Sequence, residues 1–174
     1  RWSKQYIDSE TENIESMNNL IKWLPDNLPA EKQTSIVHGD YSISNVMVGA
    51  TDPNVIAILD WELSTLGDPC ADFNYHCLQY TLNPKLADVG YCREKGVPVI
   101  DDYVKIYSDN IGIDLTDEWD LYTAYNLFKL AGILQGILGR VRDGTAASKQ
   151  AAERASGVRG LADSGWELIE KNFK

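Results

Sequence analysis

Two short β-type segments with polar motifs at their ends constrain the fold of this chain more than any other feature. The segments are Val46–Val48 and Val55–Leu59, and the turn Gly49–Asn54 between them contains an Asp-Pro pair. His38-Gly39-Asp40 precedes the first segment, and Asp60-Trp61-Glu62 directly follows the second. Apolar β-branched runs on both sides of a turn predict a small hairpin. The hairpin therefore has both polar motifs at its ends.

The rest of the chain has the apolar spacing of helices, so we expect a mostly α (α+β) fold with this hairpin at its polar centre. A first amphipathic helix of about twenty residues carries apolar positions three and four apart, and Pro25 and Pro29 end it. A second helix is expected to begin at Asp68-Pro69 and to run to about Tyr80, followed by a long surface loop over 81–99. A short helix capped by Asp101 then ends near Gly112, and a long helix over 117–142 is capped by Thr116 and stopped by Gly144. A final helix carries an apolar stripe from Ala151 to Phe173.

Charge and cysteine content exclude several classes of function. The chain of 174 residues has a net charge of −10, which argues against a broad nucleic-acid-binding face. Its three cysteines form no CxxC pair, so we expect a reducing compartment and a cytoplasmic protein rather than a disulfide framework. The longest uncharged run in the last third, 130–139, is too short to cross a bilayer, and no partnership with a membrane is expected.

Asp40 and Asn45 are the first candidates for chemistry. A Gly before Asp40 lets the loop present that carboxylate into a cleft, where it can accept or orient the proton of a hydroxyl nucleophile. Asn45 stands where the next strand begins, and its amide oxygen suits Mg²⁺. An Asx-type turn, with both side chains bonding local backbone, is the structural alternative.

Asp60 strengthens the chemical interpretation, because it follows five largely apolar residues. A carboxylate at the end of such a strand is costly unless it is paired, hydrogen-bonded or metal-bound, and a metal shared with Asn45 is the natural partner. The alternative is a strand-end cap. Glu62 either makes an outer contact to metal or substrate or is a solvated loop residue, and the sequence leaves both open.

His38 and Asp72 are candidates for support rather than chemistry. Asp72 follows the expected N-cap Asp68 by one helical turn, so its carboxylate can hold the backbone N–H groups of the loop 38–40. His38 is expected to brace the same loop. On the long helix, Lys129 and Arg140 interrupt an apolar face; they either reach an anionic group of the substrate or extend to solvent.

Phosphoryl transfer needs one carboxylate to orient a hydroxyl, and a carboxamide and a second carboxylate to hold Mg²⁺ on the phosphates. These motifs resemble those of the aminoglycoside phosphotransferase and choline kinase superfamily. The matching stretches are His38–Asn45, Ile58–Glu62 and Gly67–Asp72. The run 55–69 is most similar to one branch, the kinase-like domain fused to acyl-CoA dehydrogenases of the family member 10 and 11 type, together with its stand-alone bacterial relatives.

The resemblance implies a protein-kinase-like fold of two lobes, of which residues 1–174 are the helical C-terminal, catalytic lobe. It implies ATP as phosphoryl donor, Mg²⁺, and a small-molecule hydroxyl as acceptor, with a hydroxyacyl-CoA as the acceptor in the dehydrogenase-fused branch. Carried over by position, Asp40 is the catalytic base, Asn45 and Asp60 are the Mg²⁺ and cofactor ligands, and Asp72 braces the loop.

One departure from the family pattern is large. An N-terminal lobe with a Gly-rich phosphate loop, a strand lysine and its glutamate partner should precede His38, but the first 35 residues contain no Gly. We therefore expect a missing N-terminal lobe as partner, and little activity from this chain alone.

Two other classes of function remain as alternatives. A catalytically silent kinase-like binding or scaffold domain has no need of Asp40, Asn45 and Asp60 together. A metal-dependent hydrolase would need more ligands than these motifs supply. The acceptor itself stays open among aminoglycosides, choline-like amines, homoserine-like compounds and acyl-CoA.

Overall fold

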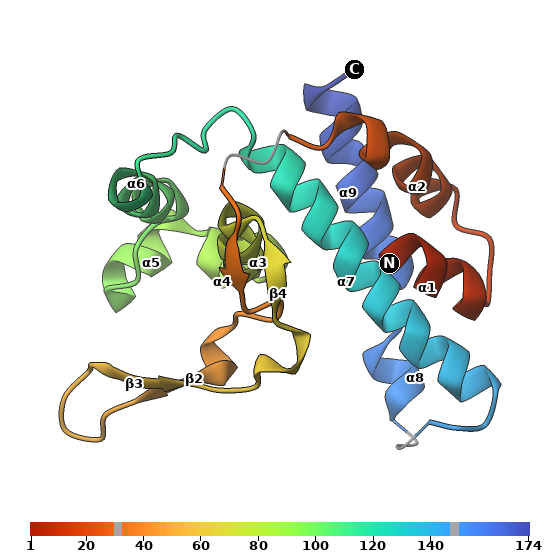
Figure 1. The fold of residues 1–174 in the computed structure, drawn as a ribbon, viewed down its shortest axis with the longest axis horizontal. Coiled ribbons are helices and arrows are strands. Elements are labelled where there is room, and N and C mark those ends of the chain that lie inside the picture. The colour runs from red at the N-terminus through yellow and green to blue at the C-terminus, as the bar shows by residue number, and fades with distance from the viewer. Residues whose placement is uncertain (30–32, 147–149) are drawn as a thin grey trace. The chain divides into compact units, whose positions relative to one another are not determined.

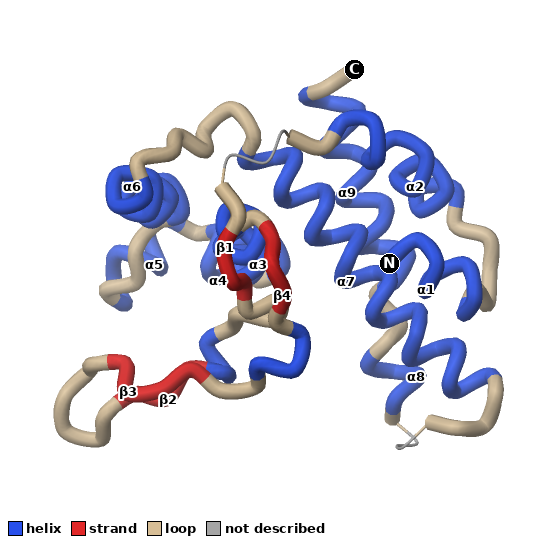
Figure 2. Tube along the Cα trace, in the orientation of Figure 1, coloured by secondary structure: helices blue, strands red, loops and turns tan. Residues whose placement is uncertain are grey.

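The computed structural model describes residues 1–29, 33–146 and 150–174 and divides the chain into two compact units. The first unit comprises residues 1–29 and 123–174, and the second comprises residues 30–122. For these described residues, the ribbon in Figure 1 and the tube in Figure 2 show helices in both units and strands in the second. The predicted mostly helical fold with a small β hairpin is confirmed.

The first unit is built from helices. They are α1 (Trp2–Ser9), α2 (Glu15–Asn27), the part of α7 (Trp119–Arg142) from residue 123 onward, α8 (Ala151–Arg154) and α9 (Val158–Asn172). The stripe Met17, Leu20 and Leu24 on α2 is fully or almost fully buried, and α2 packs against α9. The two helices lie close together at Gly165 of α9, where an added Cβ would be in van der Waals contact with the Leu20 side chain at 3.4 Å.

The prediction of one N-terminal helix is wrong in two respects. The chain forms two helices, α1 and α2, and Pro25 lies inside α2, which continues to Asn27. The interruption is stabilised by α7: Gln135 donates to the carbonyl of Ser9 and Arg142 donates to the carbonyl of Glu10. The single C-terminal helix predicted over 151–173 is likewise two helices, α8 and α9.

The second unit contains two small antiparallel sheets. In the first, β1 (Ser35–Val37) pairs with β4 (Thr65–Gly67), and in the second, β2 (Val46–Val48) pairs with β3 (Val55–Ile58). The predicted hairpin is β2–β3, with Val46 opposite Ile58. The pairing of β1 with β4 was not predicted, because a three-residue strand gives too few positions for an alternating pattern. Figure 2 shows these strands in red.

The helices of the second unit are α3 (Pro69–Leu82), α4 (Pro84–Ala87), α5 (Val89–Lys95) and α6 (Ile100–Ile111). Asp68 caps α3 as predicted, with its carboxylate accepting the Cys70 N–H at 2.8 Å. The predicted loop over 81–99 is wrong. Asn83 and Asp88 each accept a backbone N–H at a helix start, so two short helices replace the loop.

Helix boundaries in the remainder differ from the prediction by a few residues. Helix α6 begins at Ile100 rather than being capped by Asp101, and α7 begins at Trp119 rather than directly after Thr116. Gly112 and Gly144 follow the helix ends with φ of 70° and 72°, as their predicted role as stop signals requires.

The core of the second unit is aromatic and contains cysteine. Its buried residues are Cys70, Phe73, Cys77, Leu115 and Tyr122. Phe73 stacks on Tyr107 of α6 with ring centroids 3.8 Å apart. All three cysteines are buried, and none of them forms a disulfide. In the part of the chain that the structure describes, no helix combines the length and the apolarity that crossing a membrane would take.

Candidate active site

The loop between β1 and β2 is held by α3. The backbone N–H groups of His38 and Gly39 both donate to the carboxylate of Asp72, at 2.7 and 2.9 Å. These are the contacts expected of Asp72 from the sequence. A carboxylate that accepts two backbone N–H groups holds the loop more strongly than neutral hydrogen bonds would, so Asp40, the next residue, follows a rigid segment.

His38 connects this loop to the end of β3. Its Nε2 lies 2.7 Å from the carbonyl oxygen of Leu59, which can only accept, so Nε2 carries the proton. Its Nδ1 then accepts the N–H of Asp40 at 3.2 Å. The ring is buried and lies 4.9 Å from the ring of Trp61. With both ring nitrogens bonded inside the protein, His38 links the loop to the end of β3.

Gly39 is required by the close approach of two loops. Its φ is +81°, and a Cβ at this position would lie 2.4 Å from the carbonyl oxygen of Leu63. Every L-residue with a side chain would therefore be strained here and would also clash with backbone. The glycine allows the segment before Asp40 to lie directly against the turn after β3.

The hairpin brings Asn45 and Asp60 to the same end. Asn45 precedes β2 and its carbonyl accepts the N–H of Leu59 at 2.8 Å, so Asp60 is the next residue along the partner strand. The amide nitrogen of Asn45 donates to the carbonyl of Asp40 at 3.0 Å. Asp40, Asn45 and Asp60, the three residues that the sequence analysis assigned to chemistry, therefore surround one end of this hairpin.

Asp60 has an unusual backbone. Its φ of 63° and ψ of 59° make it the one non-glycine residue with positive φ in the described part of the chain. Asp is among the few residues that enter this region at a modest cost. Its side chain is exposed, so it is not a buried strand-end carboxylate as the sequence suggested. A backbone held in a sparsely populated conformation is typical of functional sites.

The donor set fits a magnesium ion that is shared with phosphates. Among the described residues, no three His, Cys, Asp or Glu side chains gather as a metal site. Mg²⁺ in phosphotransfer sites needs no such cage, because it takes one or two protein oxygens and completes its shell with water and phosphate. The amide oxygen of Asn45 and the carboxylate of Asp60 are ligands of this kind.

Tyr75 is a residue of this site that the sequence analysis missed. Burial raises the pKa of its hydroxyl, and the charge of Asp40 and a hydrogen bond to that carboxylate raise it further. Tyr75 stands on α3, three residues after Asp72. No motif marks it, because an aromatic residue in a helix next to a core looks like a packing residue.

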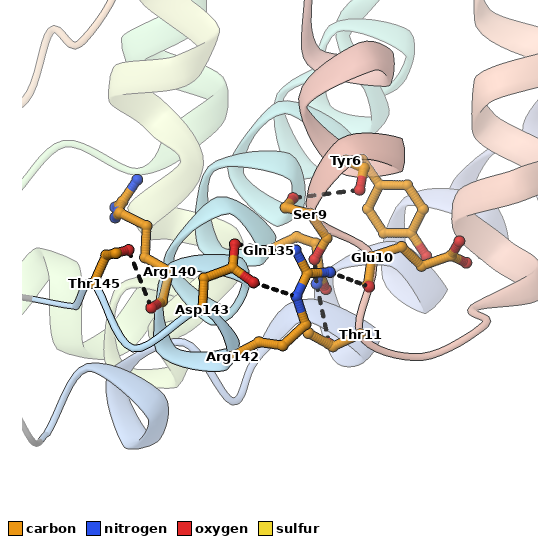
Figure 3. A network of polar contacts seen from close by, with 9 residues as sticks. All are labelled: Tyr6, Ser9, Glu10, Thr11, Gln135, Arg140, Arg142, Asp143 and Thr145. Carbon is orange, nitrogen blue, oxygen red and sulfur yellow. Dashed lines mark hydrogen bonds and ion pairs between the residues drawn. The ribbon is translucent and has the colours of Figure 1, made fainter.

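The possible substrate residues lie in different places. Glu62 is exposed in the turn after Asp60. Lys129 and Arg140 belong to the first unit. Lys129 is buried, with its ammonium 5.9 Å from the ring centroid of Trp2, whereas Arg140 is exposed beside a cavity of about 510 Å³. Figure 3 shows the carbonyl of Arg140 accepting a hydrogen bond from the hydroxyl of Thr145.

A larger cavity in the second unit contains none of the predicted site residues. It has a volume of about 720 Å³ and lies between α6 and the start of α7, where Asp101, Asp109 and Asp120 contribute to its lining.

The chain is similar to known proteins over nearly its whole length. The family model described as "Phosphotransferase enzyme family" matches residues 1–122. The chain is 38% identical to mouse acyl-CoA dehydrogenase family member 10 and 33% identical to human acyl-CoA dehydrogenase family member 11, with at least 98% of the chain covered. It spans only 16% and 23% of the lengths of these two relatives.

A solved structure is similar over the whole chain. It is a crystal structure of a Ralstonia eutropha protein provisionally described as an aminoglycoside phosphotransferase, with 45% sequence identity and a TM-score of 0.91. The match covers 100% of this chain and 54% of the other. The fold expected from the sequence, the helical lobe of a kinase-like phosphotransferase, is thereby confirmed.

Proposed function

The chain belongs to the phosphotransferase enzyme family, and from this premise we propose that it is the catalytic lobe of an ATP-dependent kinase that phosphorylates a hydroxyl group of a small molecule. The observation that carries the proposal is the gathering of Asp40, Asn45 and Asp60 around one end of the β2–β3 hairpin. An orienting carboxylate and two oxygen ligands for magnesium are the groups that phosphoryl transfer requires from this lobe.

Asp40 acts on the acceptor. Its carboxylate accepts the proton of the hydroxyl while the hydroxyl oxygen forms a bond to the γ-phosphorus of ATP. The bond from that phosphorus to the β–γ bridging oxygen breaks, and ADP leaves. Positioning and charge stabilisation account for most of the rate in such reactions, so the rigid loop anchored on Asp72 is as important as the carboxylate itself.

Asn45 and Asp60 would hold Mg²⁺, which, when bound, neutralises charge on the phosphates. The hairpin fixes the spacing of the two residues through the contact between Leu59 and the Asn45 backbone. The positive φ of Asp60 sets the direction in which its carboxylate leaves the strand. Both ligands are thus set by backbone conformation rather than by flexible side-chain placement.

A separate N-terminal lobe completes the nucleotide site in this proposal. Several large apolar side chains are exposed on and around the hairpin, including Met47, Val48, Val55 and Ile56. Contiguous apolar residues on a protein surface are typical of an interaction site. We propose that the lobe carrying the phosphate loop and the strand lysine covers them.

A hydroxyacyl-CoA is the first acceptor to test. Relatives that are 33–38% identical over nearly the whole of this chain are named as acyl-CoA dehydrogenases, which links this lobe to acyl-CoA chemistry in those proteins. The Ralstonia eutropha structure adds aminoglycosides to the candidates. The remaining classes for a panel are choline-like amines and homoserine-like compounds.

The test is acceptor-dependent ADP release from Mg²⁺-ATP by the chain extended to its natural N-terminus. We expect Asp40→Asn to lower the rate by about 10²–10⁴-fold, the range typical of a positioned general base. Asp52→Asn is the matched control, because Asp52 lies in the turn of the same hairpin and contacts Asn54.

Each outcome of this experiment is informative. Release that depends on one acceptor and is lost only in the Asp40 variant supports the kinase and identifies its substrate class. Equal rates for both variants would contradict the role of Asp40. Nucleotide binding by the wild type without release on any acceptor would favour a kinase-like binding domain.

A further inference from the structure

Helix α3 contacts the loop before β2 at successive residues. Asp72 accepts the N–H groups of His38 and Gly39, and one helical turn later the ring of His76 lies 5.0 Å from that of Tyr41. Asp40 lies between these two contacts in the loop, just as Tyr75 lies between them in the helix. Residues three and four apart share one face of a helix, so Tyr75 and His76 are on the face that Asp72 presents to the loop.

Tyr75 contacts the side chain of Asp40. Its hydroxyl makes a hydrogen bond to the carboxylate. Because a carboxylate can only accept, the tyrosine is the donor. Burial and the neighbouring charges of Asp40 and Asp72 raise the pKa of the hydroxyl, which keeps this donor protonated.

The other contacts of Asp40 hold its backbone better than its carboxylate. Its N–H donates to His38 Nδ1 and its carbonyl accepts from Asn45, at 3.2 and 3.0 Å. The carboxylate oxygen Oδ2 is 3.5 Å from the Asn45 nitrogen, which is long for a charge-assisted bond. The hydroxyl of Tyr75 is therefore a contact that can fix the direction of the carboxylate.

We propose that Tyr75 is a positioning residue, which fixes one side of the Asp40 carboxylate from α3 and leaves its other side for the acceptor hydroxyl. This inference rests on the proposed function of Asp40 as the base. It extends the support of the site from the loop backbone, which Asp72 holds, to the reacting side chain.

The kinetic test is Tyr75→Phe in the chain extended to its natural N-terminus. Loss of the hydroxyl leaves the ring in place and lets the carboxylate rotate, and misplacement of a reacting group by about 1 Å costs on the order of 10²-fold in rate. We expect kcat for acceptor-dependent ADP release to fall by about 10–100-fold, with KM for the acceptor changed by less than about threefold. A fall confined to KM, or no change, would overturn the proposal.

Tyr80→Phe is the matched control. Tyr80 lies on the same helix, and its hydroxyl donates to the carbonyl of Pro98 at 2.8 Å. This hydrogen bond does not involve Asp40. Its removal costs one hydrogen bond of α3 without touching the loop. We expect kcat within about twofold of the wild type; an equal loss in both variants would assign the effect to α3 stability instead.

A double-mutant cycle separates positioning from general destabilisation. If Tyr75 acts through Asp40, Tyr75→Phe should have no further effect in the Asp40→Asn background, because the carboxylate that it positions is gone. Independent effects would multiply instead. Multiplied losses would show that Tyr75 acts elsewhere and would contradict the proposal.

A spectroscopic measurement keeps the contact testable without activity. The extended chain is labelled with ¹³C at the Cζ atoms of its tyrosines, and the Tyr75 resonance is assigned as the one that Tyr75→Phe removes. Asp40→Asn should shift the Tyr75 resonance and leave the Tyr80 resonance in place. An unmoved Tyr75 resonance would refute the hydrogen bond. If the wild type releases no ADP with any acceptor, the proposed function fails, while this shift still decides the contact.

Discussion

At the scale of single residues, the site depends on two unusual backbone positions. Gly39 and Asp60 both have positive φ, one directly before Asp40 and the other directly after β3. Gly39 is demanded by contact with the backbone of Leu63, whereas Asp60 combines an uncommon conformation with an exposed carboxylate. Strain of this kind persists only where the surrounding structure imposes it, and here the loop, the hairpin and α3 do so.

Gly39→Ala should be much more damaging than the same change at a comparable glycine. The left-handed conformation alone costs an L-residue roughly 1–2 kcal/mol, and the added Cβ would also meet the Leu63 carbonyl. Gly96→Ala is the control, with a φ of +68° and no atom within 4 Å of its added Cβ. We expect urea unfolding to show a clearly larger loss of stability for Gly39→Ala; similar losses would mean that the two loops separate easily.

His76 should make folding stability depend on pH. Burial lowers its pKa, with the charge of Asp72 acting in the opposite direction. The unfolded chain then binds the proton more readily, so stability is full above about pH 6.5 and falls as the pH decreases towards the lower folded pKa. We expect the free energy of unfolding to drop less between pH 7.5 and 5.5 in His76→Gln than in the wild type.

The comparison isolates His76, because the chain has two histidines and the other one, His38, is present in both proteins. Parallel pH dependences in the two proteins would show that the imidazole of His76 is hydrated in the native state.

At the scale of elements, α7 decides how the N-terminal segment folds. Gln135 is fully buried, and its amide nitrogen donates to the carbonyl of Ser9 at 2.6 Å and to the hydroxyl of Thr11 at 3.0 Å (Figure 3). Arg142 reaches the carbonyl of Glu10 at 2.9 Å. These donors satisfy the carbonyl groups that end α1, so the break between α1 and α2 is imposed from a helix more than 100 residues away.

Gln135→Glu should therefore destabilise the protein more than Gln135→Leu. The leucine loses two hydrogen bonds, each worth about 1 kcal/mol. It also removes the amide oxygen, a buried atom with no hydrogen-bond partner among the described residues. The glutamate places a charge in a fully buried site and turns an oxygen towards the Ser9 carbonyl. Urea unfolding at pH 7 measures both; a glutamate variant as stable as the leucine variant would contradict the assigned contacts.

At the scale of the whole molecule, the chain is organised as two compact units. The first unit is assembled from residues 1–29 and 123–174, which are distant in sequence, and the second from the continuous stretch 30–122. The residues assigned to chemistry all lie in the second unit. Its hairpin exposes apolar side chains such as Ile56, which is 63% exposed.

If the proposed N-terminal lobe covers the hairpin and completes the nucleotide site, residues 1–174 alone should release little ADP and should bind a hydrophobic dye. The extended chain should be active and bind less dye per mole. Replacing Val55 and Ile56 with Thr in residues 1–174 should lower dye binding, since both side chains are exposed. Substantial activity of residues 1–174, or dye binding unaffected by the replacements, would contradict the proposed covering lobe.

The sequence by itself determined the local features of this protein. Val46–Val48 and Val55–Ile58 form a hairpin because β-branched runs flank a turn, and Asp68 caps α3 because its carboxylate accepts a nearby backbone N–H. The motifs around Asp40 were sufficient to predict the family, and the helical spacing of the apolar residues predicted the mostly helical fold. The roles of the site residues in catalysis remain predictions.

Only the tertiary structure decided the features that depend on distant partners. These features are the pairing of β1 with β4, the break after α1 and the contact of Tyr75 with Asp40. Each joins segments 28 or more residues apart or depends on such contacts. Local propensity carries no information about these partners, because a three-residue strand, a helix end and a helical tyrosine are each compatible with several folds. Their conformations become favourable only when packing and hydrogen bonding with the distant segment compensate for the entropy of ordering them.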